Sequence, residues 1–406
     1  MQSKESSGIP RATLASAFIL AFAMWVPTFC TPPMEHILKE GLHITHAQAS
    51  LLFSIPIWMV GAVALPAGLI ADKIGFKKAG GIEAILIVLG SLLRTTATDA
   101  SSLIAFTFIY GVGFGWAFAS LPKMISAWVP REKVGIATGI YTAGMFTGNA
   151  LALALTMPLV FPLTNSVQGV FFFWSIPAIV ATVTWWVFVK EPPAKSLNVE
   201  SMSRNNVSFR PLLSKMLKNR SLLLLSGFYA LHSFYYYTWA GWAPALVMLK
   251  GGTPEFAGFI SSLTLWIGIP ATFIIPRLVH RAGINKPFLW ASAITMVISA
   301  LVWASISLDM TWLLMVLVGF ADSAILVIVL ALPTEMVPEE EVGAASGLLI
   351  SAGHIGGAVG PLIGGHTLDR TGNLNTALLI LVGIAIAAVV LAFRLPETGP
   401  KGQSAN

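Results

Sequence analysis

The chain has 406 residues, of which 56% are hydrophobic and 10% are charged, whereas about a quarter of the residues in a soluble domain are charged. A soluble protein of this length has no core that could hold so much apolar surface, but lipid solvates such side chains if helices satisfy the backbone. The apolar runs reach about twenty residues, the length of a helix that crosses ~30 Å of hydrocarbon, which excludes a barrel of alternating strands. The composition therefore predicts an all-α membrane protein.

Twelve apolar segments separated by polar loops are predicted to cross the membrane. In the first half they occupy 12–31, 47–71, 79–97, 102–127, 133–157 and 168–190. In the second half they occupy 221–248, 255–279, 287–306, 310–333, 342–366 and 374–393. A long polar stretch separates the two sets. We therefore expect one six-helix bundle at 1–190, a cytoplasmic linker at 191–220 and a second six-helix bundle at 221–406.

The basic residues indicate how the chain is oriented. If the N-terminus is cytoplasmic, nineteen of the 24 Lys and Arg residues fall in cytoplasmic segments and Lys123 lies inside a span. The opposite side then holds Lys39, Arg94, Lys250 and Arg370. Short cytoplasmic loops of membrane proteins are enriched in Lys and Arg, so both termini are predicted to be cytoplasmic. The net charge of +6 is thus a sign of topology, and we expect no nucleic-acid partner.

The two halves carry an internal repeat at an offset of 208 residues. Val129–Gly135 aligns with Val337–Gly343, and Asp72–Gly75 aligns with His280–Gly283. One offset shared by distant loops indicates duplication. Paired six-helix halves are a known transporter plan, in which the solute binds near the midplane between the halves.

The loop after the second predicted span combines two glycines, an aspartate and a basic cluster, in the order Gly68, Asp72, Lys73, Gly75, Lys77 and Lys78. With the twelve spans and the repeat, this loop resembles the major facilitator superfamily over essentially the whole chain. The stretch Trp128–Gly148 is similar to the cyanate and nitrate/nitrite porters of that superfamily. The resemblance implies a carrier that works by alternating access and in which this loop is a conformational latch. A simple positive-inside loop would explain the lysines but not Asp72 or the glycines.

Few ionisable residues fall near the middle of a span, where each costs about 2.5–3.5 kcal/mol on insertion scales. Asp322, His232 and His354 do so in the tenth, seventh and eleventh spans. Removal from water favours the neutral form of a carboxyl group, which a proton carrier must be able to adopt. We predict that Asp322 carries a coupling proton, with His232 or His354 as its partner. The alternative is a structural aspartate paired with a lysine or with a neighbouring helix.

A further set of residues at mid-span depth is predicted to contact the solute: Lys123, Asn149, Trp25, Trp116, Tyr141, Tyr236, Trp239 and Trp266. For Lys123, two alternatives stay open, namely neutralisation of an acidic gate and snorkelling to the interface. Aromatic residues in spans also simply pack, so depth alone does not decide which of them face a cavity.

The sequence has no phosphate-binding loop and no metal-ligand spacing, and Cys30 is its single cysteine. We therefore expect no enzyme activity, no cofactor and no metal, and a monomer in the lipid bilayer. A channel is a different class of function, but duplicated halves and the latch favour a carrier. The prediction is a secondary active transporter of a bacterial or archaeal inner membrane that imports a small polar solute, an anion being favoured, with protons. The alternative is proton-driven efflux of drug-like amphipathic compounds.

Overall fold

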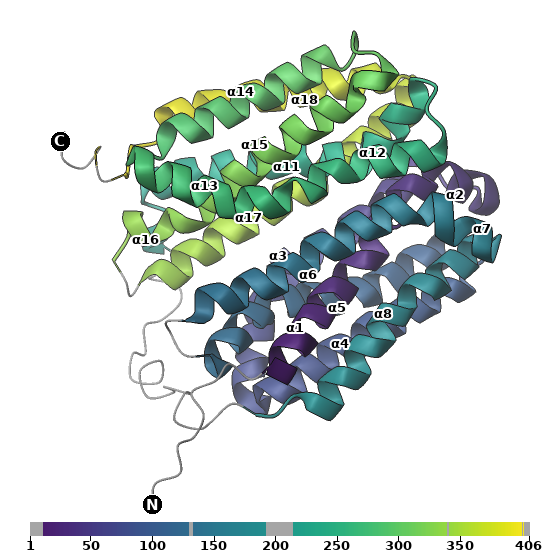
Figure 1. Ribbon diagram of the computed structural model, residues 1–406, viewed down its shortest axis with the longest axis horizontal. Helices are drawn as coiled ribbons and strands as arrows, with labels where there is room; N and C mark the ends of the chain where they lie inside the picture. Colours follow the sequence, from purple (N-terminus) through teal and green to yellow (C-terminus); the bar gives the residue numbers. More distant parts are fainter. Residues whose placement is uncertain (1–10, 130–132, 192–213, 339–340, 400, 402–406) are drawn as a thin grey trace, which may run out of the picture.

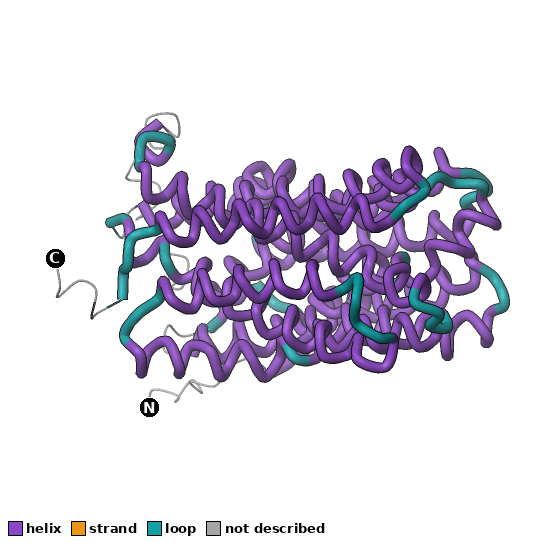
Figure 2. Tube along the Cα trace, turned by 90° about the horizontal axis from the view of Figure 1, so that it is seen from above, coloured by secondary structure: helices purple, strands orange, loops and turns teal. Residues whose placement is uncertain are grey.

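Long helices that run side by side along the longest axis make up most of the structure (Figures 1 and 2). The computed structural model describes residues 11–129, 133–191, 214–338, 341–399 and 401. The helices form two bundles, one from each half of the chain, which are coloured purple to teal and green to yellow in Figure 1. We call the end where the first helix begins and the last helix ends the termini side, and the other end the far side.

The first bundle has six long helices at the predicted positions. They are α1 (Arg11–Phe29), α3 (His46–Ile74), α4 (Phe76–Leu93), α5 (Ala100–Trp128), α6 (Val134–Leu155) and α8 (Val167–Phe188). Short elements on the far side connect them, namely η1 (Pro32–Met34), α2 (Glu35–Leu42), η2 (Arg94–Thr96), η4 (Thr156–Val160) and α7 (Phe161–Thr164).

The second bundle repeats this plan. It contains α11 (Arg220–Leu249), α12 (Pro254–Trp266), α13 (Gly268–Ala282), α14 (Lys286–Val302), η6 (Leu308–Met310), α15 (Thr311–Ala331), α16 (Pro333–Met336), α17 (Val342–Thr371) and α18 (Leu374–Arg394). The prediction of an all-α membrane protein with twelve spans is confirmed. Most of the predicted linker lies outside the described residues, so the domain boundaries stay a prediction.

Helix boundaries follow the 208-residue offset of the sequence repeat. At that offset α3 corresponds to 254–282, which is the extent of α12 and α13 together, and the start of α6 corresponds to the start of α17. The two halves differ at Ile267, where the helix that is continuous in the first half is interrupted in the second. Pro270 lies three residues after the interruption and has no N–H to bond the carbonyl four residues earlier, although α3 is continuous through its own Pro56 and Pro66.

Side-chain caps fix where most of the helices on the far side begin. Thr45 and Asp99 form capping boxes at the starts of α3 and α5, and Ser166 and Thr253 accept a backbone N–H at the starts of α8 and α12. Such caps satisfy amides that a helix leaves without partners in its first turn. The starts of α6 and α17, on the termini side, have no side-chain cap.

The outer surface of the bundles is apolar. Phe172, Val187 and Phe188 on α8 and Leu379 and Phe393 on α18 are all more than half exposed. Nine helical segments of the described chain are long and apolar enough to cross a membrane. A surface with this many large exposed hydrophobic side chains is suited to lipid rather than water.

Close contact between α11 and α17 depends on glycine. A Cβ atom on Gly356 would overlap the backbone carbonyl of Ala230, and one on Gly360 would overlap that of Phe234. Small residues allow membrane helices to approach until their backbones touch, and the gain is van der Waals packing.

We predict that Gly356→Ala destabilises the protein by about 1–3 kcal/mol, the usual cost of overpacking. Gly383→Ala on α18 is the matched control, because a Cβ atom there meets no atom within 4 Å. Thermal unfolding of both variants in detergent measures the difference. Equal melting temperatures would show that the contact between α11 and α17 is not set by this glycine.

Candidate functional site

A cavity of about 240 Å³ lies between the two bundles and is lined by residues of α1, α5, α6, α11, α15 and α17. Its wall is largely aromatic and aliphatic. Among the described residues that line it, Asp322, His232 and His354 are the ionisable groups apart from tyrosines, and none is lysine or arginine.

Residues related by the sequence repeat face each other across this cavity. Seven pairs at the 208-residue offset line it: Met24 with His232, Trp25 with Ser233, Phe29 with Tyr237, Phe118 with Leu326, Pro122 with Leu330, Thr142 with Ile350, and Phe146 with His354. The cavity therefore lies where the two halves of the repeat meet. The two histidines and the aspartate all come from the second half, and the first half has Met24 and Phe146 at the positions equivalent to the histidines.

Asp322 and His232 are in contact, as the sequence predicted for one of the two histidines. His232 Nε2 lies 3.0 Å from Asp322 Oδ1, and both side chains are buried. The His232 ring is stacked between Tyr229 and Tyr236, at centroid distances of 5.9 and 6.4 Å and interplanar angles of 15° and 11°. These three residues share one face of α11 because they are three and four positions apart. The stacking holds the imidazole against the carboxylate.

His354 lies in the wall of the same cavity but has different neighbours. Its ring contacts Phe118 of the first bundle edge-on, at a centroid distance of 4.8 Å. Nδ1 lies 2.8 Å from the carbonyl oxygen of Ile350. Since a carbonyl only accepts, Nδ1 carries a proton, and Nε2 is left without a hydrogen-bond partner among the described residues.

The predicted solute-binding residues divide into two groups. Trp25, Tyr141, Asn149 and Tyr236 line the cavity, whereas Lys123, Trp116, Trp239 and Trp266 are not part of its lining. Trp239 shows why. Its ring packs against Tyr235 and Trp303 in the core of the second bundle.

Two charged residues near the ends of the third predicted span are buried inside the first bundle. Glu83 is 0% exposed and accepts a hydrogen bond from Ser120 Oγ at 2.5 Å. Arg94 is 1% exposed, donates to the carbonyl oxygen of Pro27 at 2.7 Å and lies 4.2 Å from the ring centre of Phe171. Neighbouring helices cover both side chains, so their charged groups have partners inside the bundle rather than at the membrane interface.

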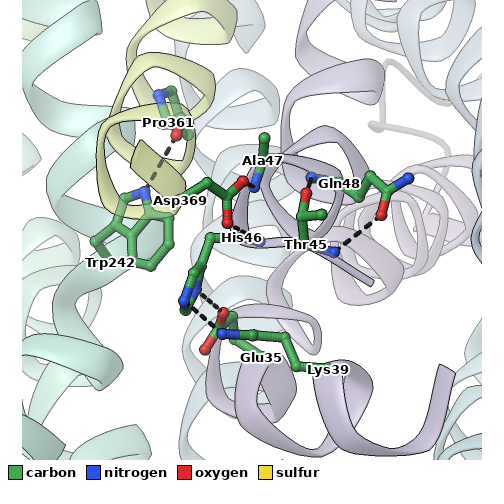
Figure 3. Close-up of polar contacts among 9 residues, drawn as sticks. All are labelled: Glu35, Lys39, Thr45, His46, Ala47, Gln48, Trp242, Pro361 and Asp369. Carbon is green, nitrogen blue, oxygen red and sulfur yellow. Dashed lines mark hydrogen bonds and ion pairs between the residues drawn. The ribbon is translucent and has the colours of Figure 1, made fainter. Parts of the chain in front are cut away.

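On the far side, one carboxylate joins the two bundles (Figure 3). Asp369, near the end of α17, accepts hydrogen bonds from the backbone N–H groups of His46 and Ala47 in the first turn of α3, both at 2.9 Å. A carboxylate at a helix N-terminus satisfies free amides and interacts favourably with the helix dipole. We call this contact the clasp. Sequence analysis missed it, because its partners are backbone atoms more than 320 residues away along the chain.

Side chains around the clasp reinforce it. His46 Nδ1 lies 2.5 Å from Glu35 Oε1, and its Nε2 lies 2.5 Å from Lys39 Nζ (Figure 3). The Trp242 ring of the second bundle lies 5.9 Å from the His46 ring, and its Nε1 donates to the carbonyl oxygen of Pro361 at 3.1 Å. Charged and aromatic groups of both bundles thus meet at one place.

The bundles are in contact on the far side and apart on the termini side. A Cβ atom on Gly365 would overlap Ser50 and the carbonyl of His46 in the other bundle. By contrast, Gly135 and Gly139 in α6 and Gly343 and Gly347 in α17, all close to the termini side, have no atom within 4 Å of such a Cβ. Open space therefore borders α6 and α17 near the termini side.

The predicted latch lies at the hairpin between α3 and α4. Gly75 joins these helices with φ +89°, a conformation that favours glycine, and Glu191 lies beside it. Trp185 Nε1 donates to the carbonyl oxygen of Lys77 at 2.9 Å and fixes the hairpin to α8. Lys73 and Lys78 are exposed. The side chain of Asp72 and the surroundings of Gly68 lie outside the described residues, so the latch stays a prediction.

Comparison with known proteins agrees with this architecture. The model of the Major Facilitator Superfamily matches residues 14–320 and 250–406. The uncharacterised transporter YycB of Bacillus subtilis (strain 168) is 23% identical, over 92% of this chain and 90% of its own length. The cyanate transport protein CynX of Escherichia coli (strain K12) is 21% identical, over 90% of this chain and 93% of its own length.

A solved structure has the same fold. A bacterial homologue of the human lysosomal transporter Spinster, in an inward-facing and occupied conformation, superposes with a TM-score of 0.76 at 15% identity, over 97% of this chain and 98% of its own. The family match covers the chain from within its first described helix to residue 406. The two bundles, the sequence repeat and the central cavity agree with this match. This chain belongs to the Major Facilitator Superfamily of transporters.

Proposed function

We propose that this protein imports a small polar solute, an anion being favoured, together with protons by alternating access. The observation that supports this most directly is the contact between Asp322 and His232 in a cavity that is closed on one side. With the termini in the cytoplasm, as the basic residues predict, the far side is extracellular. The structure is then the inward-open state of the carrier, held by the clasp.

The charges in the cavity support coupling to protons. An anion that enters an apolar cavity without lysine or arginine in its wall has no fixed cation to compensate it, and such a charge is costly to leave uncompensated. A proton that travels with the anion makes the transported charge neutral. Asp322 and His232 together provide a place to hold that proton during the change of conformation.

The relatives and the size of the cavity support a small solute. CynX, which is named for cyanate transport, matches nearly the whole chain. A volume of about 240 Å³ is below the ~300–1,000 Å³ usual for sites of drug-sized ligands. The aromatic wall would suit the alternative, efflux of amphipathic compounds, but its dimensions favour the import of a small molecule.

We predict that Asp322→Asn abolishes proton-coupled accumulation, because the amide cannot bind and release the coupling proton. Cyanate and small carboxylates are offered to proteoliposomes, and acidification of the lumen is followed with a pH-sensitive dye. Asp309→Asn, an exposed aspartate at the far side, is the control and should behave as wild type. Acidification by Asp322→Asn at the wild-type rate would refute the coupling role.

We predict that Asp369→Ala shifts the protein towards the outward-open state by about five- to thirtyfold. Two backbone N–H groups donate to this exposed carboxylate only while the far side is closed, and together these hydrogen bonds are worth about 1–2 kcal/mol. The readout is labelling of Gly347→Cys by an impermeant maleimide in inside-out vesicles. The native Cys30 is buried, which keeps the background low.

Asp99→Ala is the matched control for the clasp. Asp99 also caps a helix on the far side, but it accepts from Ser102 N within its own bundle, at 3.0 Å. It should leave the labelling of position 347 unchanged. Equal labelling in Asp369→Ala and Asp99→Ala would mean that Asp369 is an ordinary helix cap and not a clasp between the bundles.

A further inference from the structure

Several buried polar atoms in the cavity wall have no hydrogen-bond partner among the described residues. They are Trp25 Nε1, Asn149 Oδ1, His232 Nδ1 and His354 Nε2, whose residues are 3%, 6%, 2% and 4% exposed. Buried polar groups in proteins are nearly always hydrogen-bonded, so four such atoms around one cavity require an explanation. A solute that binds in the cavity and supplies the missing hydrogen-bond partners is a sufficient explanation.

Neighbouring rings hold these groups in place. The Trp25 indole packs edge-on against Phe114 at 4.7 Å and against Phe118 at 6.2 Å. The His354 ring contacts Phe118 from the other bundle, and its Nδ1 is engaged by Ile350. The indole therefore offers a fixed N–H donor, and neutral His354 offers a fixed acceptor at Nε2. A solute that satisfies both carries an acceptor and a donor.

The wall also indicates the shape of the solute. Tyr229, His232 and Tyr236 form a column of rings whose neighbouring planes are within 15° of parallel. Flat conjugated molecules gain ~0.5–1.5 kcal/mol from stacked or edge-on contact with aromatic rings beyond the burial of their area, about a two- to twelvefold gain in affinity. A saturated ring of the same size presents its hydrogen atoms out of plane and loses this gain.

We propose that the central cavity binds a small, planar, conjugated acid that carries a hydrogen-bond donor next to its acid group. Trp25 Nε1–H binds an acid oxygen, and Asn149 Oδ1 or His354 Nε2 accepts the donor. This inference rests on the proposed function, since it takes the cavity to be the transport site. It adds the class of the solute and the residues that recognise it.

Three five-membered-ring acids of similar size test the class. Pyrrole-2-carboxylate is planar and has an N–H donor, furan-2-carboxylate is planar without the donor, and cyclopentanecarboxylate is neither planar nor a donor. Binding of radiolabelled pyrrole-2-carboxylate to the purified full chain is measured by scintillation proximity, and the other two acids compete. We expect affinity to fall in that order, about three- to tenfold at each step.

Variants test the recognising atoms. Trp25→Phe keeps the ring but removes the N–H donor, and should weaken both planar acids equally, about three- to tenfold. Asn149→Leu and His354→Phe remove the acceptors, and at least one of them should lower the preference for pyrrole over furan towards one. Trp312→Phe is the control for Trp25→Phe, because Trp312 is exposed on the outer surface, and should bind as wild type.

Three results would overturn the proposal. In the first, cyclopentanecarboxylate binds with an affinity within twofold of that of pyrrole-2-carboxylate; in the second, none of the three acids binds at millimolar concentration. In the third, the ratio of the affinities for pyrrole-2-carboxylate and furan-2-carboxylate is unchanged in both acceptor variants. Equilibrium binding needs no proton gradient. Failure here therefore leaves the coupling role of Asp322 standing, and failure of the Asp322→Asn acidification test leaves the class of solute standing.

Discussion

A charge in the middle of a membrane protein must have a partner, and this constraint organises the centre of the molecule. Asp322 is buried in the wall of the central cavity and has His232 as its partner, whose ring is stacked between two tyrosines of the same helix. Around that pair the wall is apolar, so the carboxylate and the imidazole depend on each other.

The two halves repeat the same arrangement of helices, but they differ in the polar and ionisable residues that line the cavity. Equivalent positions of the two halves line one cavity, yet His232 replaces Met24 and His354 replaces Phe146 when the second half is compared with the first. The first half contributes Trp25 and Asn149, whose polar atoms have no partner among the described residues. Equivalent positions therefore line the cavity with different chemistry, since the acidic and imidazole groups come from the second half only.

The sequence predicted how deep a residue lies in the membrane better than whether its side chain lines the cavity. The lengths of the apolar runs located all the long helices. The sequence also showed the repeat and the mid-span positions of Asp322 and His232. Which residues of a helix line the cavity was not visible, because α11 is apolar or aromatic all round, so Tyr236 and Trp239, three positions apart, looked alike. The burial of Glu83 and Arg94 depends on helices that pack from elsewhere in the chain. Asp369 binds backbone amides, which leave no trace in side-chain patterns.

The prolines of α3 and of its counterpart in the second bundle have a mechanical consequence. In the first bundle α3 is continuous over 29 residues, about 44 Å, and connects the clasp at one end to the Gly75 hairpin at the other. It contains Pro56 and Pro66, and its counterpart contains Pro270 and Pro276, so each copy has points at which a long helix can bend. At Ile267 the backbone angles and the hydrogen bonds on both sides stay helical. The prolines stand at different positions in the two copies, since Pro56 and Pro66 correspond to Thr264 and Ile274, so the two halves can bend at different depths of the membrane.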